Sequence, residues 1–140
     1  MYRQDYILRL IEQFGKALIA LRDRILRRET DRQKMGAEIG EMARQAGLDL
    51  GVARSLDQAS LMMWLAPAGQ VDQPRLWLMA ELLFLEGLAA VESEDLAAGR
   101  ADLGRALAIL ERLEPDWRPA EDLPSAANLA DEIRELLQRP

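Results

Sequence analysis

A helix formed by residues 76–91 would be apolar on nearly all of its faces, because Glu81 and Glu86 are the only charged side chains in this stretch. A helix that is apolar all round must be covered by protein on several sides. The stretch is too short and too interrupted for a membrane span, which needs about 20 nearly uninterrupted apolar residues. We therefore expect it to be the central helix of a bundle, or to lie at an oligomer interface.

The remaining apolar residues also recur at helical spacing, and no run alternates Val, Ile or Thr as strands require. The sequence predicts an all-α fold, a six-helix bundle that contains a helical hairpin resembling a tetratricopeptide repeat. Five of the expected helices cover residues 5–28, 32–46, 72–91, 96–113 and 125–138. The sixth is a short helix that follows a Ser55/Gln58 capping box and ends before Pro67.

The chain of 140 residues is near the usual size of one domain, so we expect a single helical domain over residues 1–140. Residues 66–74 contain two prolines and a glycine, and they form the clearest internal break. They mark a possible sub-boundary.

Composition excludes several kinds of active site. The sequence contains no histidine and no cysteine, which removes thiolate and imidazole nucleophile systems and the usual zinc and di-iron ligands. The 18 basic and 24 acidic residues give an acidic chain, which disfavours general binding to phosphate backbones. Charged residues interrupt the apolar positions of the N-terminus, unlike a signal peptide. We expect a cytoplasmic protein with no metal, no cofactor and no membrane association.

A heptad-like apolar stripe runs along the first expected helix, with the 4-3-4-3-4 spacing of a helix–helix contact. Because an oligomer would bury such a stripe, it is our candidate interface: Ile7, Ile11, Phe14, Leu18, Leu21 and Ile25. Four arginines crowd the end of the same helix, where cations favour the helix dipole: Arg22, Arg24, Arg27 and Arg28. They form either a solvated cap or a site for an anion or an acidic partner.

The expected hairpin from Leu83 to Leu113 resembles a tetratricopeptide repeat. Small residues at the close approach and apolar residues at the usual offsets carry the resemblance: Gly87, Gly99, Leu103 and Ala106. Three positions depart from the repeat pattern: Glu86, Ala90 and Glu111. Since a solenoid needs at least three stacked repeats, one degenerate unit inside a bundle is the better interpretation.

The opening residues 4–13, Gln-Asp-Tyr-Ile-Leu-Arg-Leu-Ile-Glu-Gln, precede this hairpin. Together they resemble a family of short, uncharacterised bacterial helical proteins. The resemblance covers most of the chain in order and implies an all-helical fold, without implying an activity or catalytic residues.

Residues 39–58 resemble a DNA-binding helix-turn-helix in the spacing of their small and apolar positions: Ala43, Gly47, Ala53 and Leu56. The expected recognition helix offers only Arg54 for a base or phosphate contact, and Asp57 follows it. Two helices that meet at a glycine turn give the same pattern without DNA.

Carboxylates are the remaining candidates for catalysis. A buried Glu81 or Glu86 would have a raised pKa and could act as an acid or base. Five residues correspond to about 140° of helix rotation, so the two side chains should point apart. We expect each to reach solvent or to pair with an arginine, and we predict no catalytic residues.

Large flexible and aromatic side chains flank the break at residues 66–74 and could line an adaptable groove for a partner helix or peptide. These candidate groove residues are Met62, Met63, Trp64, Trp77 and Met79. The sequence thus predicts a non-catalytic protein–protein interaction or scaffold module that forms a homo-oligomer. The alternative is a DNA-binding regulator that uses residues 39–58.

Overall fold

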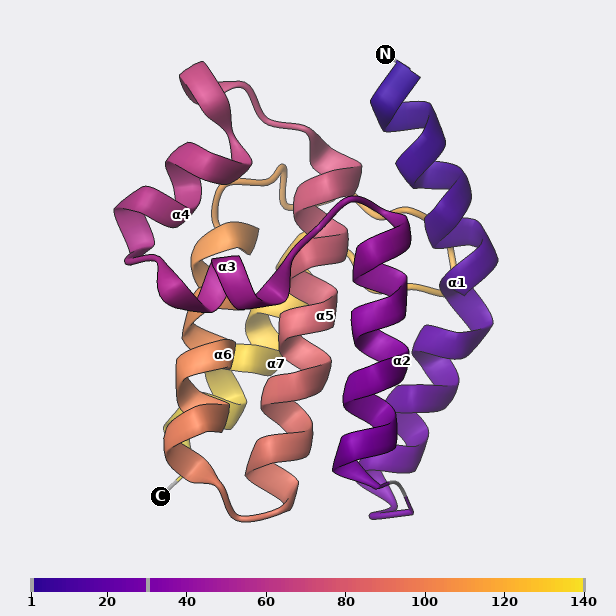
Figure 1. Ribbon diagram of the computed structural model, residues 1–140, viewed down its shortest axis with the longest axis vertical. Coiled ribbons are helices and arrows are strands. Elements are labelled where there is room, and N and C mark those ends of the chain that lie inside the picture. Colours follow the sequence, from indigo (N-terminus) through magenta and orange to yellow (C-terminus); the bar gives the residue numbers. More distant parts are fainter. Residues whose placement is uncertain (1, 30, 140) are drawn as a thin grey trace.

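The structure, a computed structural model, describes residues 2–29 and 31–139, with side chains from residue 6 onward (Figure 1). Helices and loops account for all of this described part, which confirms the all-α prediction. The elements are α1 (Tyr2–Leu26), α2 (Arg32–Gln45), α3 (Leu50–Ser55), α4 (Gln58–Leu65), the short 3-10 helix η1 (Pro67–Gly69), α5 (Gln73–Glu92), α6 (Leu96–Leu110) and α7 (Ala126–Gln138).

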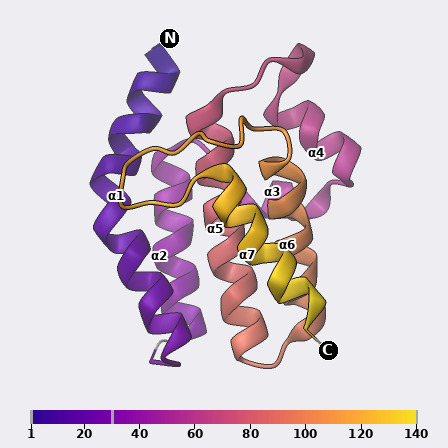
Figure 2. The ribbon, with the colours of Figure 1, turned by 180° about the vertical axis from the view of Figure 1, so that it is seen from behind.

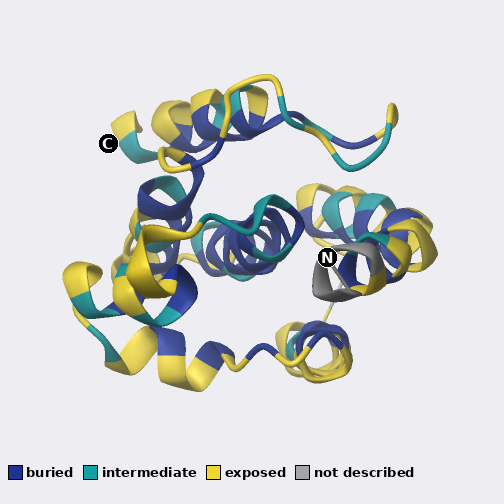
Figure 3. Ribbon diagram, turned by 90° about the horizontal axis from the view of Figure 1, so that it is seen from above, coloured by how far each residue is buried: buried dark blue, intermediate teal, exposed yellow. Residues whose placement is uncertain are grey.

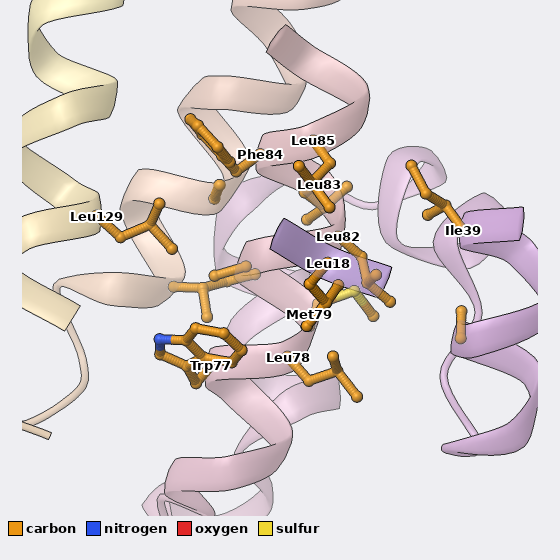
Figure 4. Packing of buried hydrophobic residues seen from close by; sticks show 14 of the residues in the cluster. Leu18, Ile39, Trp77, Leu78, Met79, Leu82, Leu83, Phe84, Leu85 and Leu129 are labelled. Carbon is orange, nitrogen blue, oxygen red and sulfur yellow. The ribbon is translucent and has the colours of Figure 1, made fainter. Parts of the chain in front are cut away.

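Helix α5 lies in the middle of the structure, with α1, α2, α6 and α7 packed around it (Figure 3). Its side chains point outward in several directions into one continuous apolar cluster (Figure 4). Trp77 and Phe84 lie on one face of the helix and Leu82 on another, and all three are fully buried. The position of α5 agrees with the apolar pattern of residues 76–91. In the described part of the chain, no helix combines the length and the apolarity that crossing a bilayer requires.

Aspartates define where most of the helices begin. The side chains of Asp72 and Asp95 accept hydrogen bonds from the first-turn amides of α5 and α6. The predicted Ser55/Gln58 capping box is wrong. Asp57 caps α4 by accepting from the amide of Ser60 at 2.7 Å, and Ser55 is the last residue of α3. Two short helices therefore occupy the region between α2 and Pro67, and the structure has one more α-helix than predicted.

The α5–α6 hairpin is packed closely at two glycines. A Cβ atom on Gly99 would lie 2.6 Å from Val91 Cγ2 and 3.0 Å from the carbonyl oxygen of Gly87. A Cβ on Gly87 would lie 2.9 Å from Leu103 Cγ. No larger side chain fits without moving the helices apart, so the predicted close approach is confirmed.

The segment between α6 and α7 crosses α5, reaches α1 and returns (Figure 2). Leu113 and Leu123 are buried along it, and the partly buried Trp117 packs on the core. Trp77 Nε1 donates to the carbonyl oxygen of Pro124 at 3.0 Å. The segment thus covers a side of α5 that would otherwise be exposed and positions the start of α7.

Candidate functional site

The candidate interface on α1 is part of the core. Its six residues are 0–8% exposed in the single chain: Ile7, Ile11, Phe14, Leu18, Leu21 and Ile25. The stripe packs on α5, and a side chain that is already covered cannot contact a second copy. The expectation that this stripe is an oligomer interface is therefore wrong, because an apolar helical stripe does not reveal which chain covers it.

The candidate groove residues separate into two groups. Trp77 and Met79 of α5 are fully buried in the core, so they line no groove, and that part of the prediction is wrong. Met62, Met63 and Trp64 lie on α4 near the surface. The guanidinium of Arg75 lies over the Trp64 ring, 5.8 Å from its centroid, which leaves the two methionines as the accessible pair.

The two methionines line an open hollow of about 890 Å³ between α4, η1 and the end of α6. We call this the α4–η1 surface, defined by Met62, Met63, Ala66, Pro67 and Arg112. Met63 is 74% exposed, more than any other large apolar side chain that the structure describes. The surface is mostly apolar, with Arg112 as the only charged residue in the lining.

The local sequence explains why Met63 faces outward. Leu61 and Leu65, four residues apart on one face of α4, are buried against the core. Met63, halfway between them, points about 200° of rotation away from each and so toward solvent. Pro67 then ends the helix, and Ala68 and Gly69 turn the chain with positive φ angles of 58° and 74°. The turn forms one wall of the hollow.

The predicted DNA-contacting residue, Arg54, is bound within the molecule. Its Nε and Nη2 donate to the two carboxylate oxygens of Asp102 at 3.1 and 3.0 Å, and Nη2 also contacts Glu86. Arg105 donates to the same Asp102 and to the carbonyl oxygen of Arg54. A guanidinium that faces two carboxylates is poorly placed to reach a phosphate, so this arrangement disfavours the DNA-binding alternative.

The two glutamates of α5 point to different helices, as their spacing predicts. Glu86 pairs with Arg54 of α3, which is the expected structural role. Glu81 is different, because the residue is 2% exposed and its Oε1 accepts no hydrogen bond from any described residue. Burial raises the pKa of Glu81 to about 7, while the charge of Arg22 lowers it and that of Glu132 raises it.

The arginines at the end of α1 are largely paired within the chain. Arg22, Arg24 and Arg28 form ion pairs with Glu132, Glu38 and Glu92. These pairs tie α1 to α7, α2 and α5, so they hold neighbouring helices together rather than forming one site for an anion.

Two residues that the sequence did not single out belong to these sites. Arg112 borders the hollow, and Glu132 shares Arg22 with Glu81. Glu132 is 110 residues from Arg22, so no local spacing links them. Arg112 follows the last turn of α6, where solvated arginines are common, so the sequence around it gives no sign of a site. It belongs to the α4–η1 surface only because α4 lies next to it.

Among the side chains of residues 6–29 and 31–139, no cluster of three or more acidic groups is arranged to hold a metal ion. Comparisons with protein-family models, curated protein sequences and solved structures find no match to this chain.

Proposed function

We propose that this protein is a non-catalytic protein–protein interaction module and that the α4–η1 surface contacts its partner. The observation that supports the proposal most is the 74% exposure of Met63 at the edge of an apolar hollow. Exposed apolar side chains beside a concave surface are typical of partner-binding sites. Methionine suits this role because its flexible thioether adapts to different apolar shapes.

The chemistry of the hollow favours one kind of occupant. Met62, Met63, Ala66 and Pro67 offer an apolar surface for a large apolar side chain of the partner. Arg112 is exposed, and its guanidinium forms no ion pair with any residue that the structure describes. A carboxylate next to the apolar side chain would complement this charge. We infer that the partner is a protein segment with a large apolar residue beside Asp or Glu.

The non-catalytic part of the proposal is supported by the chemistry of the chain. It has no histidine and no cysteine, and its most buried carboxylates are enclosed or bound. Glu86 is held by Arg54, and Glu81 is buried where a substrate cannot reach it. Neither borders the α4–η1 hollow.

We also propose that the α5–α6 hairpin is a tetratricopeptide-like scaffold element that positions α4. The contact of Gly87 with Gly99, and the burial of Leu103 and Ala106, support this assignment. Helix α4 packs on α6, so a rigid hairpin would hold the hollow in a fixed place.

A random peptide display library tests the proposed surface. We expect selection on the wild-type protein to enrich peptides with a large apolar residue next to Asp or Glu. Met63→Glu should weaken their binding at least about tenfold, because a charge replaces the most exposed apolar contact of the surface. Arg112→Glu should shift selection toward peptides with Lys or Arg beside the apolar residue.

The matched control is Leu96→Glu, which changes another exposed apolar residue that is 46% exposed on α6. This variant should bind the selected peptides as the wild type does. Peptides that bind Met63→Glu as tightly as wild type, or a selection that enriches no such peptide, would contradict the proposal. A concentration-dependent dimer in light scattering that Met63→Glu dissociates would show instead that a second copy occupies the surface.

A further inference from the structure

The buried carboxyl group of Glu81 lies where two other helices approach α5. Arg22 reaches this region from α1, and Glu132 reaches it from α7. Arg22 Nη1 donates to Glu132 Oε1 at 2.8 Å, and the guanidinium lies over the Phe84 ring, 4.8 Å from its centroid. The side chains of Arg22, Glu81 and Glu132 form what we call the Glu81 cluster.

Two polar atoms of the Glu81 cluster have no partner in the described part of the chain. They are Arg22 Nη2, a donor, and Glu81 Oε1, an acceptor, and both are buried. A buried polar atom without a hydrogen bond costs free energy. The cluster therefore contains both halves of a hydrogen bond that the present arrangement does not form.

The charges of the Glu81 cluster do not balance, because one cation faces two carboxyl groups. Two other arginines do not restore the balance, because both are already paired. Arg24 is bound by Glu38 of α2, and Arg54 is bound by Asp102 of α6. Glu81 is only 2% exposed, whereas the side chain of Glu132 is 33% exposed and can turn toward water. When both carboxyl groups are ionised, Glu132 is the one able to leave.

We propose that the Glu81 cluster is a proton-linked switch: when Glu81 loses its proton, Arg22 turns from Glu132 to Glu81, and the ion pair between α1 and α7 opens. With Glu81 protonated, Arg22 belongs to Glu132 and the pair is intact, as in the structure. With Glu81 ionised, Arg22 Nη2 has a charged acceptor inside the core, and Glu132 is repelled into solvent. Burial, which raises the pKa of Glu81 to about 7, places this change near neutral pH.

The switch would loosen α7 rather than release it. Leu129 and Ile133 remain buried against the core in either state. Arg100 also donates to the carbonyl oxygen of Arg139 just beyond α7, and Arg134 pairs with Glu111. These contacts do not involve Glu81, so the change should be confined to the side of α7 that faces α1.

Hydrogen exchange of α7 peptides between pH 5.5 and 8.5, corrected for the intrinsic pH dependence of exchange, tests the switch. In the wild type, protection of α7 should fall about tenfold across pH 7, as expected when the opened state becomes well populated. Glu81→Gln, which keeps the neutral shape, should hold α7 protected at every pH. The control Glu86→Gln lies five residues away on the same helix and should show the same fall as the wild type.

Glu132→Gln weakens the α7 end of the pair directly. In this variant, α7 should be less protected from exchange than in the wild type at pH 5.5. Its protection there should be close to that of the wild type at pH 8.5. A wild-type profile without a step near pH 7 would overturn the proposal. The same step in Glu81→Gln would also overturn it, because the proton would then be lost from another group.

Discussion

Glu81 and Glu86 are the same residue type on the same helix, five positions apart, yet they lie in opposite electrostatic surroundings. Around Glu86, two arginines face two carboxylates, because Arg54 and Arg105 meet Glu86 and Asp102. Around Glu81, the single cation Arg22 is already bound by Glu132. The comparison shows that the helices packed on α5, and not α5 itself, set the electrostatic surroundings of each carboxyl group.

Solvent access adds to this difference. The side chain of Glu86 is 17% exposed, so water screens its charge in part, and Arg54 adjoins it. Glu81 is 2% exposed, and desolvation is the largest cause of its raised pKa. A charge-balanced cluster near the surface should stabilise the fold at neutral pH, whereas the Glu81 cluster should destabilise it as pH rises.

The largest expected effect is the pH dependence of stability. Glu81 ionises near 4.5 when unfolded and near 7 when folded, so the folded state binds more protons between these values. The free energy of unfolding should therefore fall as pH rises from 5 to 8, with a contribution of about 3 kcal/mol from Glu81. Urea unfolding at several pH values measures this fall.

Glu81→Gln is the matched variant for that measurement, because it keeps the shape and cannot ionise. Its free energy of unfolding should change much less between pH 5 and 8 than that of the wild type. At pH 8 the variant should be the more stable of the two. If wild type and Glu81→Gln have parallel pH profiles, Glu81 is not the group that titrates.

The second prediction concerns a variant that removes the charge balance around Glu86. Arg54→Met leaves Glu86 and Asp102 with Arg105 alone, which copies the excess of carboxylates found around Glu81. We expect the free energy of unfolding at pH 7 to fall by about 2 kcal/mol, less than for a fully buried pair because Arg54 is partly exposed. Chemical denaturation measures this loss, provided that the m-value is unchanged. A loss below about 0.5 kcal/mol would show that the ion pairs of Arg54 contribute little to stability.

The third prediction concerns a variant that removes only the charge of Glu86. Glu86→Gln should lower the unfolding free energy by about 1 kcal/mol, since Arg54 keeps both hydrogen bonds to Asp102. Its stability should depend on pH between 5 and 8 as that of the wild type does. A profile as flat as that expected of Glu81→Gln would remove the distinction between the two glutamates.

The smallest expected effect lies outside both regions. Met63→Glu should change the free energy of unfolding by less than about 0.5 kcal/mol, because the side chain is mostly in solvent. Thermal melting of the variant measures this directly. A larger loss would mean that Met63 packs into the fold, and the peptide-binding experiment would then need a more conservative variant.

Much of the fold follows from the sequence because it is encoded locally. The apolar pattern of residues 76–91 predicts a covered helix, and Asp72 and Asp95 indicate where α5 and α6 begin. The glycines at positions 87 and 99 predict the close approach of that hairpin. Each of these signals depends on residues a few positions apart.

The errors concern which parts of the chain meet. The stripe on α1 carries the same pattern whether a second copy or α5 covers it, so periodicity could not identify it as core. The same limit applied to Trp77 and Met79, which are buried rather than part of a groove. Arg22 and Glu132 are 110 residues apart, and only the packing of α1 and α7 on α5 brings them together.

The most direct test of the difference between the two glutamates is a carboxyl ¹³C NMR titration of Glu81 in the folded wild-type protein. Comparison with Glu81→Gln would assign its resonance. We predict a midpoint near pH 7, raised by burial and by Glu132 against the opposing charge of Arg22. A midpoint between 4 and 5 would show that Glu81 is solvated or paired like an ordinary carboxylate, and would contradict both the charge imbalance and the proposed switch.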